Sequence, residues 1–165
     1  MTEFQSVHER FSRDVYWFPL YLCGNRTQAE DITSETFIRL WTARGEIRTS
    51  TLKAYLLAIA RNIYVTELRR QSRLAPIEAS LADTRVNIER DAATRSSLSR
   101  VLHALRQLPE PDRAALLMRA ERQPYEEIAQ MLCLSLTAVK VKVHRARIKL
   151  LEICENKEVS HDDHT

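Results

Sequence analysis

Glycine is scarce in this sequence, since only Gly24 and Gly45 occur among 165 residues. Tight β-hairpin turns and the phosphate-binding loops of nucleotide-binding folds both depend on glycine. The scarcity therefore argues against a hairpin-rich β fold and against a Gly-rich phosphate loop. Leu, Ala, Arg and Glu are abundant instead, and all four favour helices. The composition predicts an all-α protein.

Cysteine pairs and long apolar runs are also missing. Cys23, Cys133 and Cys154 are odd in number, far apart and in no CxxC pattern, which argues against a disulfide framework and against a zinc site. Such cysteines fit a reducing compartment. Because the N-terminus is polar and no long apolar run follows, we expect no signal peptide, no membrane insertion and a cytoplasmic location.

Groups for catalysis are missing in the same way. No Ser/His/Asp or Cys/His arrangement stands out, and the carboxylates lie mainly on predicted helix faces. The tail segment 161–164 holds two His and two Asp, but no matching ligand pattern occurs elsewhere, and such tails are normally solvated. We therefore expect no enzymatic activity, no metal site and no cofactor.

Positive charge is present, and it is concentrated near the C-terminus. The net charge is +3, yet residues 139–149 contain five Lys or Arg and no Asp or Glu. These five are Lys140, Lys142, Arg145, Arg147 and Lys149. A concentrated basic strip favours a polyanionic partner. The simpler interpretation, a solvated helix face, stays open at this point.

Residues 1–73 are predicted to form a first helical module. Its first apolar stripe recurs at three- and four-residue steps and comprises Phe4, Val7, Phe11 and Val15. Pro19 is expected to interrupt or kink this helix, and Gly24 to end it.

Two further helices follow in this module. Thr27 and Glu30 have the spacing of a capping box, which predicts a helix from there to about Trp41. Phe37 and Trp41 are expected in its core. The polar stretch 44–51 is expected to be a loop, and the apolar spacing after it predicts a long helix over about 52–70.

The periodicity fades after residue 72, so residues 74–95 are predicted to be a flexible linker. It returns in residues 96–155, which we predict to be a second helical module, with one short helix that has Pro111 in its first turn and another that Pro124 opens. Ser135 is a natural N-cap for a last helix to about Cys154. Residues 156–165 are expected to be a polar, frayed tail.

The segment 125–150 predicts a helix-turn-helix. Ile128, Ala129 and Leu132 face inward on its first helix, and the second helix has a buried stripe of Val139, Val143, Ala146 and Leu150. A helix with such a stripe and a basic opposite face can enter a DNA major groove. A helical hairpin with a solvated basic face is the alternative. Cys133 stands in the turn, where a positive φ usually favours Gly, so either some backbone strain or a slightly different turn is expected there.

Three segments carry a family resemblance. GNRTQAEDITSETFIRLW is similar to region 2.2, and LKAYLLAIARNIYVTELRRQSR to regions 2.3 and 2.4, of the extracytoplasmic-function (group 4) sigma factors of the σ70 family. LRQLPEPDRAALLMRAERQPYEEIAQMLCLSLTAVKVKVHRARIKL resembles their region 4. The resemblance implies two helical modules that recognise promoter DNA as part of RNA polymerase.

The resemblance also implies functional residues. In the first module, residues implied to dock on the β′ clamp helices of the polymerase core are Asp31, Glu35 and Arg39. Those implied to handle the −10 promoter element are Gly45, Arg48, Tyr55, Arg61, Asn62, Arg69 and Arg70. Tyr55 and Tyr64 could stack on bases, but core packing is favoured for both. In the second module, residues implied to face the −35 element are Thr137, Ala138, Lys140, Val141, His144 and Arg145.

The implied partners are the polymerase core, through its β′ clamp helices and β flap, promoter DNA and an anti-sigma factor. One alternative remains, a helix-turn-helix regulator whose first half senses a ligand or dimerises. That alternative leaves the motifs AEDITSETFIRLW and IARNIYVTELRR unexplained.

Overall fold

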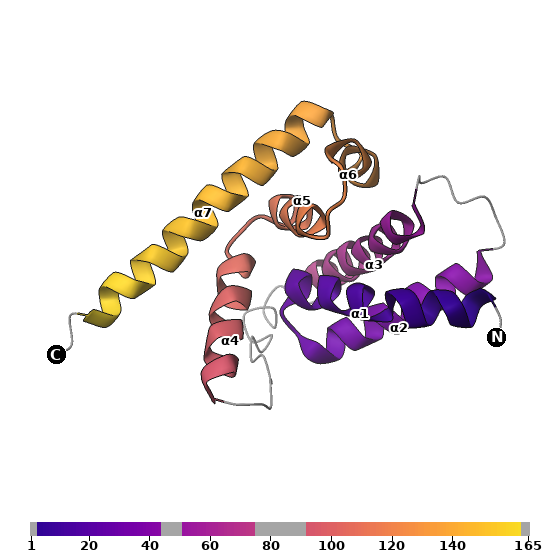
Figure 1. Cartoon of the computed structure of the whole chain (residues 1–165), viewed down its shortest axis with the longest axis horizontal. Helices are drawn as coiled ribbons and strands as arrows, with labels where there is room; N and C mark the ends of the chain where they lie inside the picture. Colours follow the sequence, from indigo (N-terminus) through magenta and orange to yellow (C-terminus); the bar gives the residue numbers. More distant parts are fainter. Residues whose placement is uncertain (1–2, 44–50, 75–91, 163–165) are drawn as a thin grey trace. The chain divides into compact units, whose positions relative to one another are not determined.

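The computed structural model describes residues 3–43, 51–74 and 92–162. All regular elements in these ranges are helices, as predicted (Figure 1). They divide into two compact units, Met1–Ile88 (unit 1) and Glu89–Thr165 (unit 2). The predicted linker, residues 74–95, lies mostly outside the described residues, and its last part, 92–95, belongs to a helix of unit 2.

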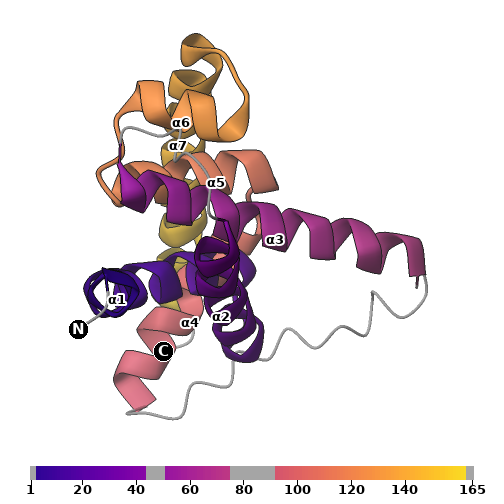
Figure 2. The same ribbon diagram turned by 90° about the vertical axis from the view of Figure 1, so that its right-hand side faces the viewer.

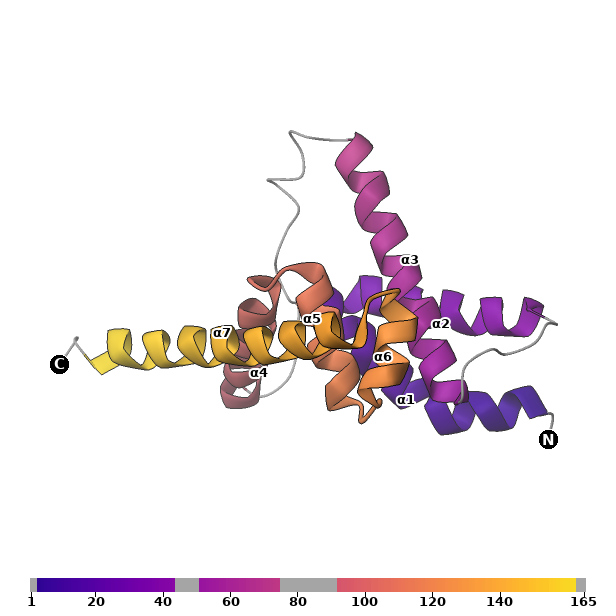
Figure 3. The ribbon, with the colours of Figure 1, turned by 90° about the horizontal axis from the view of Figure 1, so that it is seen from above.

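Unit 1 contains α1 (Glu3–Cys23), α2 (Arg26–Thr42) and α3 (Leu52–Leu74). α1 and α2 run side by side in opposite directions, and α3 crosses them (Figure 3). A core of Val15, Phe37 and Leu56 takes one residue from each helix, and the predicted stripe of α1 packs against it. The C-terminal part of α3 projects beyond the other two helices (Figure 2). This helix ends four residues later than predicted, at Leu74 instead of Arg70.

The expected interruption at Pro19 is wrong, because α1 continues through this residue to Cys23. Proline lacks the N–H that would bond to the carbonyl of Val15. The hydroxyl of Thr33 lies 3.4 Å from that carbonyl oxygen and 2.7 Å from the carbonyl oxygen of Ala29. A side chain of α2 therefore partly replaces the missing donor. Gly24 then ends the helix as predicted, with a φ of 68°.

The predicted capping box is also wrong. α2 begins at Arg26, and its N-cap is Asn25, whose Oδ1 accepts a hydrogen bond from the N–H of Gln28 at 2.9 Å. Asn is at least as good an N-cap as Thr. Because Gly24 turns the chain directly after α1, Asn25 reaches the capping position first, and Thr27 lies inside the helix.

Unit 2 contains α4 (Ala92–Arg106), α5 (Glu110–Ala120), α6 (Tyr125–Leu132) and α7 (Leu136–Asp162). Pro111 lies in the first turn of α5 and Pro124 directly precedes α6, as predicted. The guanidinium of Arg113 closes the end of α4, since its Nη1 donates to the carbonyl oxygens of Leu108 at 3.0 Å and Leu105 at 3.4 Å. α5 and α6 both pack on α7.

The expectation of a frayed tail is wrong for residues 156–162, because α7 continues to Asp162. No Gly or Pro follows Cys154, and Lys and Glu in this stretch are good helix formers. The C-terminal part of α7, drawn in yellow, projects past the other helices of unit 2 (Figure 1).

Candidate nucleic-acid interface

The turn between α6 and α7 has the geometry of a helix-turn-helix. Cys133 has φ 55° and ψ 44°, the left-handed conformation that its position predicted. The N–H of Leu134 donates to the carbonyl oxygen of Ala129 at 2.9 Å. Ser135 caps α7 as predicted, since its Oγ accepts from the N–H of Ala138 at 3.1 Å. These bonds hold the two helices in a fixed arrangement.

Most of the residues predicted to form the core of these two helices are buried. Ile128 and Leu132 are buried, and Ala129 is half-buried. On α7, the predicted stripe has three buried residues and one half-buried residue, in order Val139, Val143, Ala146 and Leu150. Burial of this stripe fixes which residues of α7 face outward.

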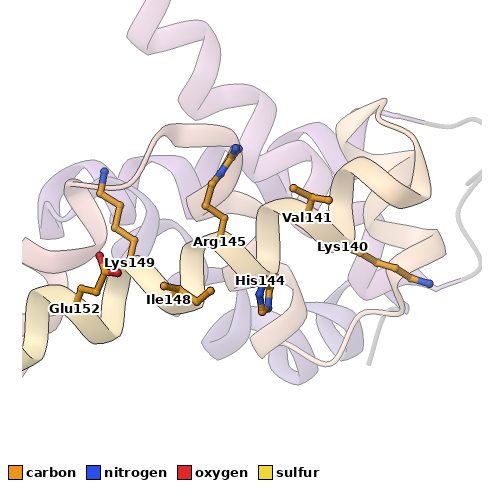
Figure 4. Close-up of a pocket in the computed structure, with 7 residues that line it drawn as sticks. All are labelled: Lys140, Val141, His144, Arg145, Ile148, Lys149 and Glu152. Atoms are coloured by element: carbon orange, nitrogen blue, oxygen red, sulfur yellow. The ribbon is translucent and has the colours of Figure 1, made fainter.

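The outer face of α7 carries a shallow hollow of about 580 Å³ (Figure 4). Its lining residues are Lys140, Val141, His144, Arg145, Ile148, Lys149 and Glu152. Figure 4 shows Arg145 and Lys149 on one side of the helix and Lys140 and His144 on the other. Four of the six predicted −35 residues therefore gather on one exposed face. Of the other two, Thr137 is exposed and Ala138 half-buried in the first turn of α7.

A buried acid contacts this face, and sequence reasoning missed it. Asp112 of α5 has a side chain only 4% exposed. Its Oδ2 accepts from Nε of Arg145 at 3.0 Å, and its Oδ1 accepts from Nη2 of Arg145 at 3.3 Å and from Nζ of Lys142 at 3.4 Å. No periodic pattern links residues on α5 and α7. The only signal was an Asp in the first turn of a predicted helix, where negative charge is favourable.

Lys140 has an aromatic neighbour on α6. Its Nζ lies 6.0 Å from the ring centroid of Tyr125, and the guanidinium of Arg119 lies 4.6 Å from the same centroid. Cations at these distances are attracted to the face of an aromatic ring. The ring of Tyr125 therefore has two positive charges beside it, near the N-terminal end of α7.

In unit 1, the predicted docking residues share the outer face of α2. Asp31 and Arg39 are exposed and Glu35 is half-buried, and Nε of Arg39 lies 3.1 Å from Oε1 of Glu35. Two large apolar side chains, Ile38 and Trp41, lie on the same helix and are 55% and 58% exposed. Phe37 is buried as predicted.

The expectation that Trp41 belongs to the core is wrong. This residue stands at the end of α2, where the ring of Phe4 packs on it edge-on, with 4.7 Å between ring centroids. The helical spacing predicted a buried side, but 58% of the Trp41 surface is exposed beside that ring.

The predicted −10 residues divide into two groups. Gly45 and Arg48 lie outside the described residues. On α3, Tyr55 and Arg61 are half-buried, whereas Asn62, Arg69 and Arg70 are exposed.

Two further features of α3 concern the predicted −10 residues: the burial of Tyr64 and a hydrogen bond between Arg70 and Glu67. Tyr64 is buried, as expected. Arg70 donates to Glu67 at 2.7 Å, and this hydrogen bond lowers the pKa of the Glu67 carboxyl and raises the pKa of Arg70. The guanidinium of Arg70 is therefore partly engaged by Glu67.

None of the described helices is long and apolar enough to cross a membrane. Within the described ranges, no three His, Cys, Asp or Glu side chains gather so that they could hold a metal ion.

The geometry of the two units defines a class of protein. In this class, a helical unit with an exposed, partly apolar helix face is joined in one chain to a helix-turn-helix unit with a basic outer face.

Comparisons with known proteins agree with this class. Residues 7–74 match the family described as Sigma-70 region 2, and residues 98–150 match Sigma-70, region 4. The chain is 30% identical over 154 residues to the RNA polymerase sigma factor CarQ of Myxococcus xanthus, with 91% of this chain and 88% of CarQ covered.

It is also 31% identical over 147 residues to the ECF RNA polymerase sigma factor SigE of Mycolicibacterium smegmatis, with 82% of this chain covered but only 55% of SigE. Its fold is similar to that of the sigma factor RpoE in a crystal complex with the anti-sigma factor NepR from Bartonella quintana. That likeness has a TM-score of 0.82 at 24% identity and covers 94% of this chain and 98% of RpoE.

The chain therefore belongs to the σ70 family of sigma factors, in its extracytoplasmic-function group. The match of residues 7–74 to region 2 explains the motifs that a plain helix-turn-helix regulator leaves unexplained, so that alternative is not favoured.

Proposed function

We propose that this chain is the promoter-recognition subunit of a bacterial RNA polymerase holoenzyme and directs transcription initiation from its own set of promoters. The observation that carries the proposal is the order of the two matched regions, 7–74 and 98–150, each on its own helical unit. Transcription initiation by such a factor needs no chemistry from the chain itself, and we propose that it is not an enzyme and acts in the cytoplasm.

Unit 1 is proposed to bind the β′ clamp helices through the outer face of α2. Asp31, Glu35 and Arg39 supply charge there, and the exposed Ile38 and Trp41 supply apolar area. Exposed apolar residues beside charged ones are typical of protein interfaces. α3 is proposed to hold the −10 element. Its exposed Asn62 and Arg69 fit contacts to unstacked bases and phosphates.

Unit 2 is proposed to bind the β flap and to place the outer face of α7 in the major groove at the −35 element. The exposed Lys140 and His144 and the apolar Val141 are the residue types that read base edges and thymine methyl groups there. Two weak modules on one tether bind selectively, because each raises the effective concentration of the other.

An anti-sigma factor is proposed as a further partner that covers the polymerase-binding surfaces. The similar fold of RpoE was solved in a complex with NepR, which supports such a partner. The exposed apolar side chains of α2 are suited to be covered by one.

The test is transcription with purified core polymerase and fragments of the source genome, followed by mapping of RNA 5′ ends. We expect discrete start sites that appear only when the chain is added, with a shared pair of sequence elements upstream. A chain that neither binds the core nor changes its start sites would refute the proposal. Tight dimeric binding to duplex DNA without polymerase would instead favour the regulator.

A further inference from the structure

A buried carboxylate on α5 accepts hydrogen bonds from two basic side chains of α7. Asp112 lies in the first turn of α5, and both of its oxygens accept hydrogen bonds from Arg145, at 3.0 and 3.3 Å. Lys142 adds a third bond at 3.4 Å. The side chain of Asp112 is 4% exposed, whereas that of Arg145 is 59% exposed. The acid is therefore inside unit 2 and the guanidinium at its surface.

We propose that Asp112 is a positioning residue that determines which bases α7 reads, because it orients Arg145 and withdraws Lys142 from the DNA-facing surface. This inference rests on the proposed function, since it assumes that the outer face of α7 enters a major groove.

The orientation of Arg145 follows from the two parallel bonds. A guanidinium has five N–H donors in a rigid plane. Asp112 takes the Nε–H and one N–H of Nη2, so the donors that remain lie on Nη1 and on the outer side of Nη2. Two such donors match the O6 and N7 acceptors of a guanine edge. A guanidinium held in one plane can make this pair of bonds at one position, whereas a mobile one would contact any nearby phosphate.

Lys142 differs from Arg145, because contact with Asp112 keeps it from the DNA-facing surface. Its side chain is only 22% exposed, and its ammonium group lies against the same carboxylate. A lysine in this state contributes little to the sequence-independent attraction of phosphates. Asp112 thereby lowers general DNA affinity and leaves the readable part of α7 to Arg145, Val141 and His144.

A purely structural role for Asp112 is the competing explanation, because the carboxylate also joins α5 to α7. That role predicts lower stability and an equal loss of binding to every promoter. Positioning predicts a change in base preference at the position that Arg145 reads, together with unchanged or higher affinity for unrelated DNA. Base preference therefore separates the two explanations.

The experiment uses holoenzyme reconstituted from core polymerase and the full chain. The probe is a pool of promoter fragments that share one mapped −10 element and carry a randomised −35 block. Bound fragments are sequenced, and the preference at each position is compared among wild type, D112N and E126Q. Glu126 is an exposed acid in the first turn of α6, so E126Q removes the same charge from unit 2 without touching Arg145.

For D112N we expect preference at one or two positions to fall at least about fivefold, the lower end of what one bidentate base contact supplies. Release of Lys142 should also steepen the dependence of log K on log salt by about one phosphate contact. E126Q should keep the wild-type preference. In base preference, the double variant D112N/R145A should match R145A alone, because both changes affect that preference through the same guanidinium.

R145K is a second variant, in which an ammonium group keeps the positive charge beside the buried Asp112. Lysine keeps the charge but cannot make two parallel bonds. R145K should therefore lose preference at the same positions while retaining general affinity.

Wild-type preference in D112N or in R145K would overturn the inference and leave the proposed function intact. If the D112N holoenzyme bound every fragment of the pool more weakly by the same factor, the inference would also be overturned. If the wild-type holoenzyme itself shows no preference in the −35 block, the proposed role of unit 2 is wrong, and the inference falls with it.

Discussion

At the scale of single residues, the outer face of α2 combines opposite charges with two exposed apolar side chains. Glu35 and Ile38 are three residues apart, and Asp31 and Ile38 are seven apart, so all three lie on one side of the helix. Surface ion pairs such as that between Glu35 and Arg39 contribute little to stability. The residues on this face are therefore open to substitution without unfolding unit 1, which makes binding tests on them clean.

Reversal of charge on this face should weaken polymerase binding. In D31K/E35K, two acids become bases opposite a surface that we expect to complement them, and core affinity should fall by about tenfold or more. Fluorescence anisotropy of labelled chain titrated with core polymerase measures this. E3K/E9K, which makes the same charge change at two exposed positions of α1, is the control. Equal loss in both variants would count against α2 as the docking face.

Ile38 should contribute to the same interface through its apolar area. With 55% of its surface exposed, its change to Ser should leave the free energy of unfolding within about 0.5 kcal/mol of wild type. Core binding should weaken by about 1–2 kcal/mol if the side chain is buried on docking. Urea denaturation and the same titration measure the two quantities, and a stability loss without a binding loss would contradict the assignment.

At the scale of elements, the turn between α6 and α7 stores strain at Cys133. A non-glycine residue in the left-handed region, here with φ 55°, costs about 1 kcal/mol or more. C133G should relieve this and raise the free energy of unfolding by about 0.5–1 kcal/mol, measured by urea denaturation. C133A is the matched control, because it keeps a Cβ and should gain nothing. A loss of stability in C133G would show that the turn is unstrained.

The presence of the helices and their buried stripes could be predicted from the sequence, because both follow from the spacing of apolar residues along the chain. The stripe of α1 and the buried Val139, Val143 and Ala146 of α7 are of this kind. Helix ends were harder, since they depend on competition between neighbours, as between Asn25 and Thr27 for the N-cap of α2.

Long-range contacts could not be predicted from spacing at all. Asp112 and Arg145 are joined only because α5 packs on α7, and Thr33 reaches Val15 only because α2 packs on α1. The exposure of Trp41 has the same origin, since burial at the end of α2 depends on how α1 packs on it. The candidate site was thus predicted as a set of residues on α7, while the contacts that orient them required the fold.

At the scale of the whole molecule, the two units are proposed to act together because one chain carries both. Separate pieces, 1–74 and 92–165, should therefore fail where the intact chain succeeds. Mixed at the same concentration with core polymerase, they should give promoter occupancy lower by about 10²–10⁴-fold, the usual effect of tethering. Circular dichroism of each piece checks that it is helical. Full activity of the mixture would contradict the need for a tether.

The most direct test of the whole account locates unit 2 on promoter DNA within the holoenzyme. Cys133 and Cys154 are exposed and Cys23 is buried, so in C154S an iron chelate can be attached to Cys133, in the helix-turn-helix. Radical cleavage of a mapped promoter should then cluster at the −35 element, and C133S/C154S should give no cuts. Cleavage confined to the −10 region, or cuts spread along the fragment, would contradict the account.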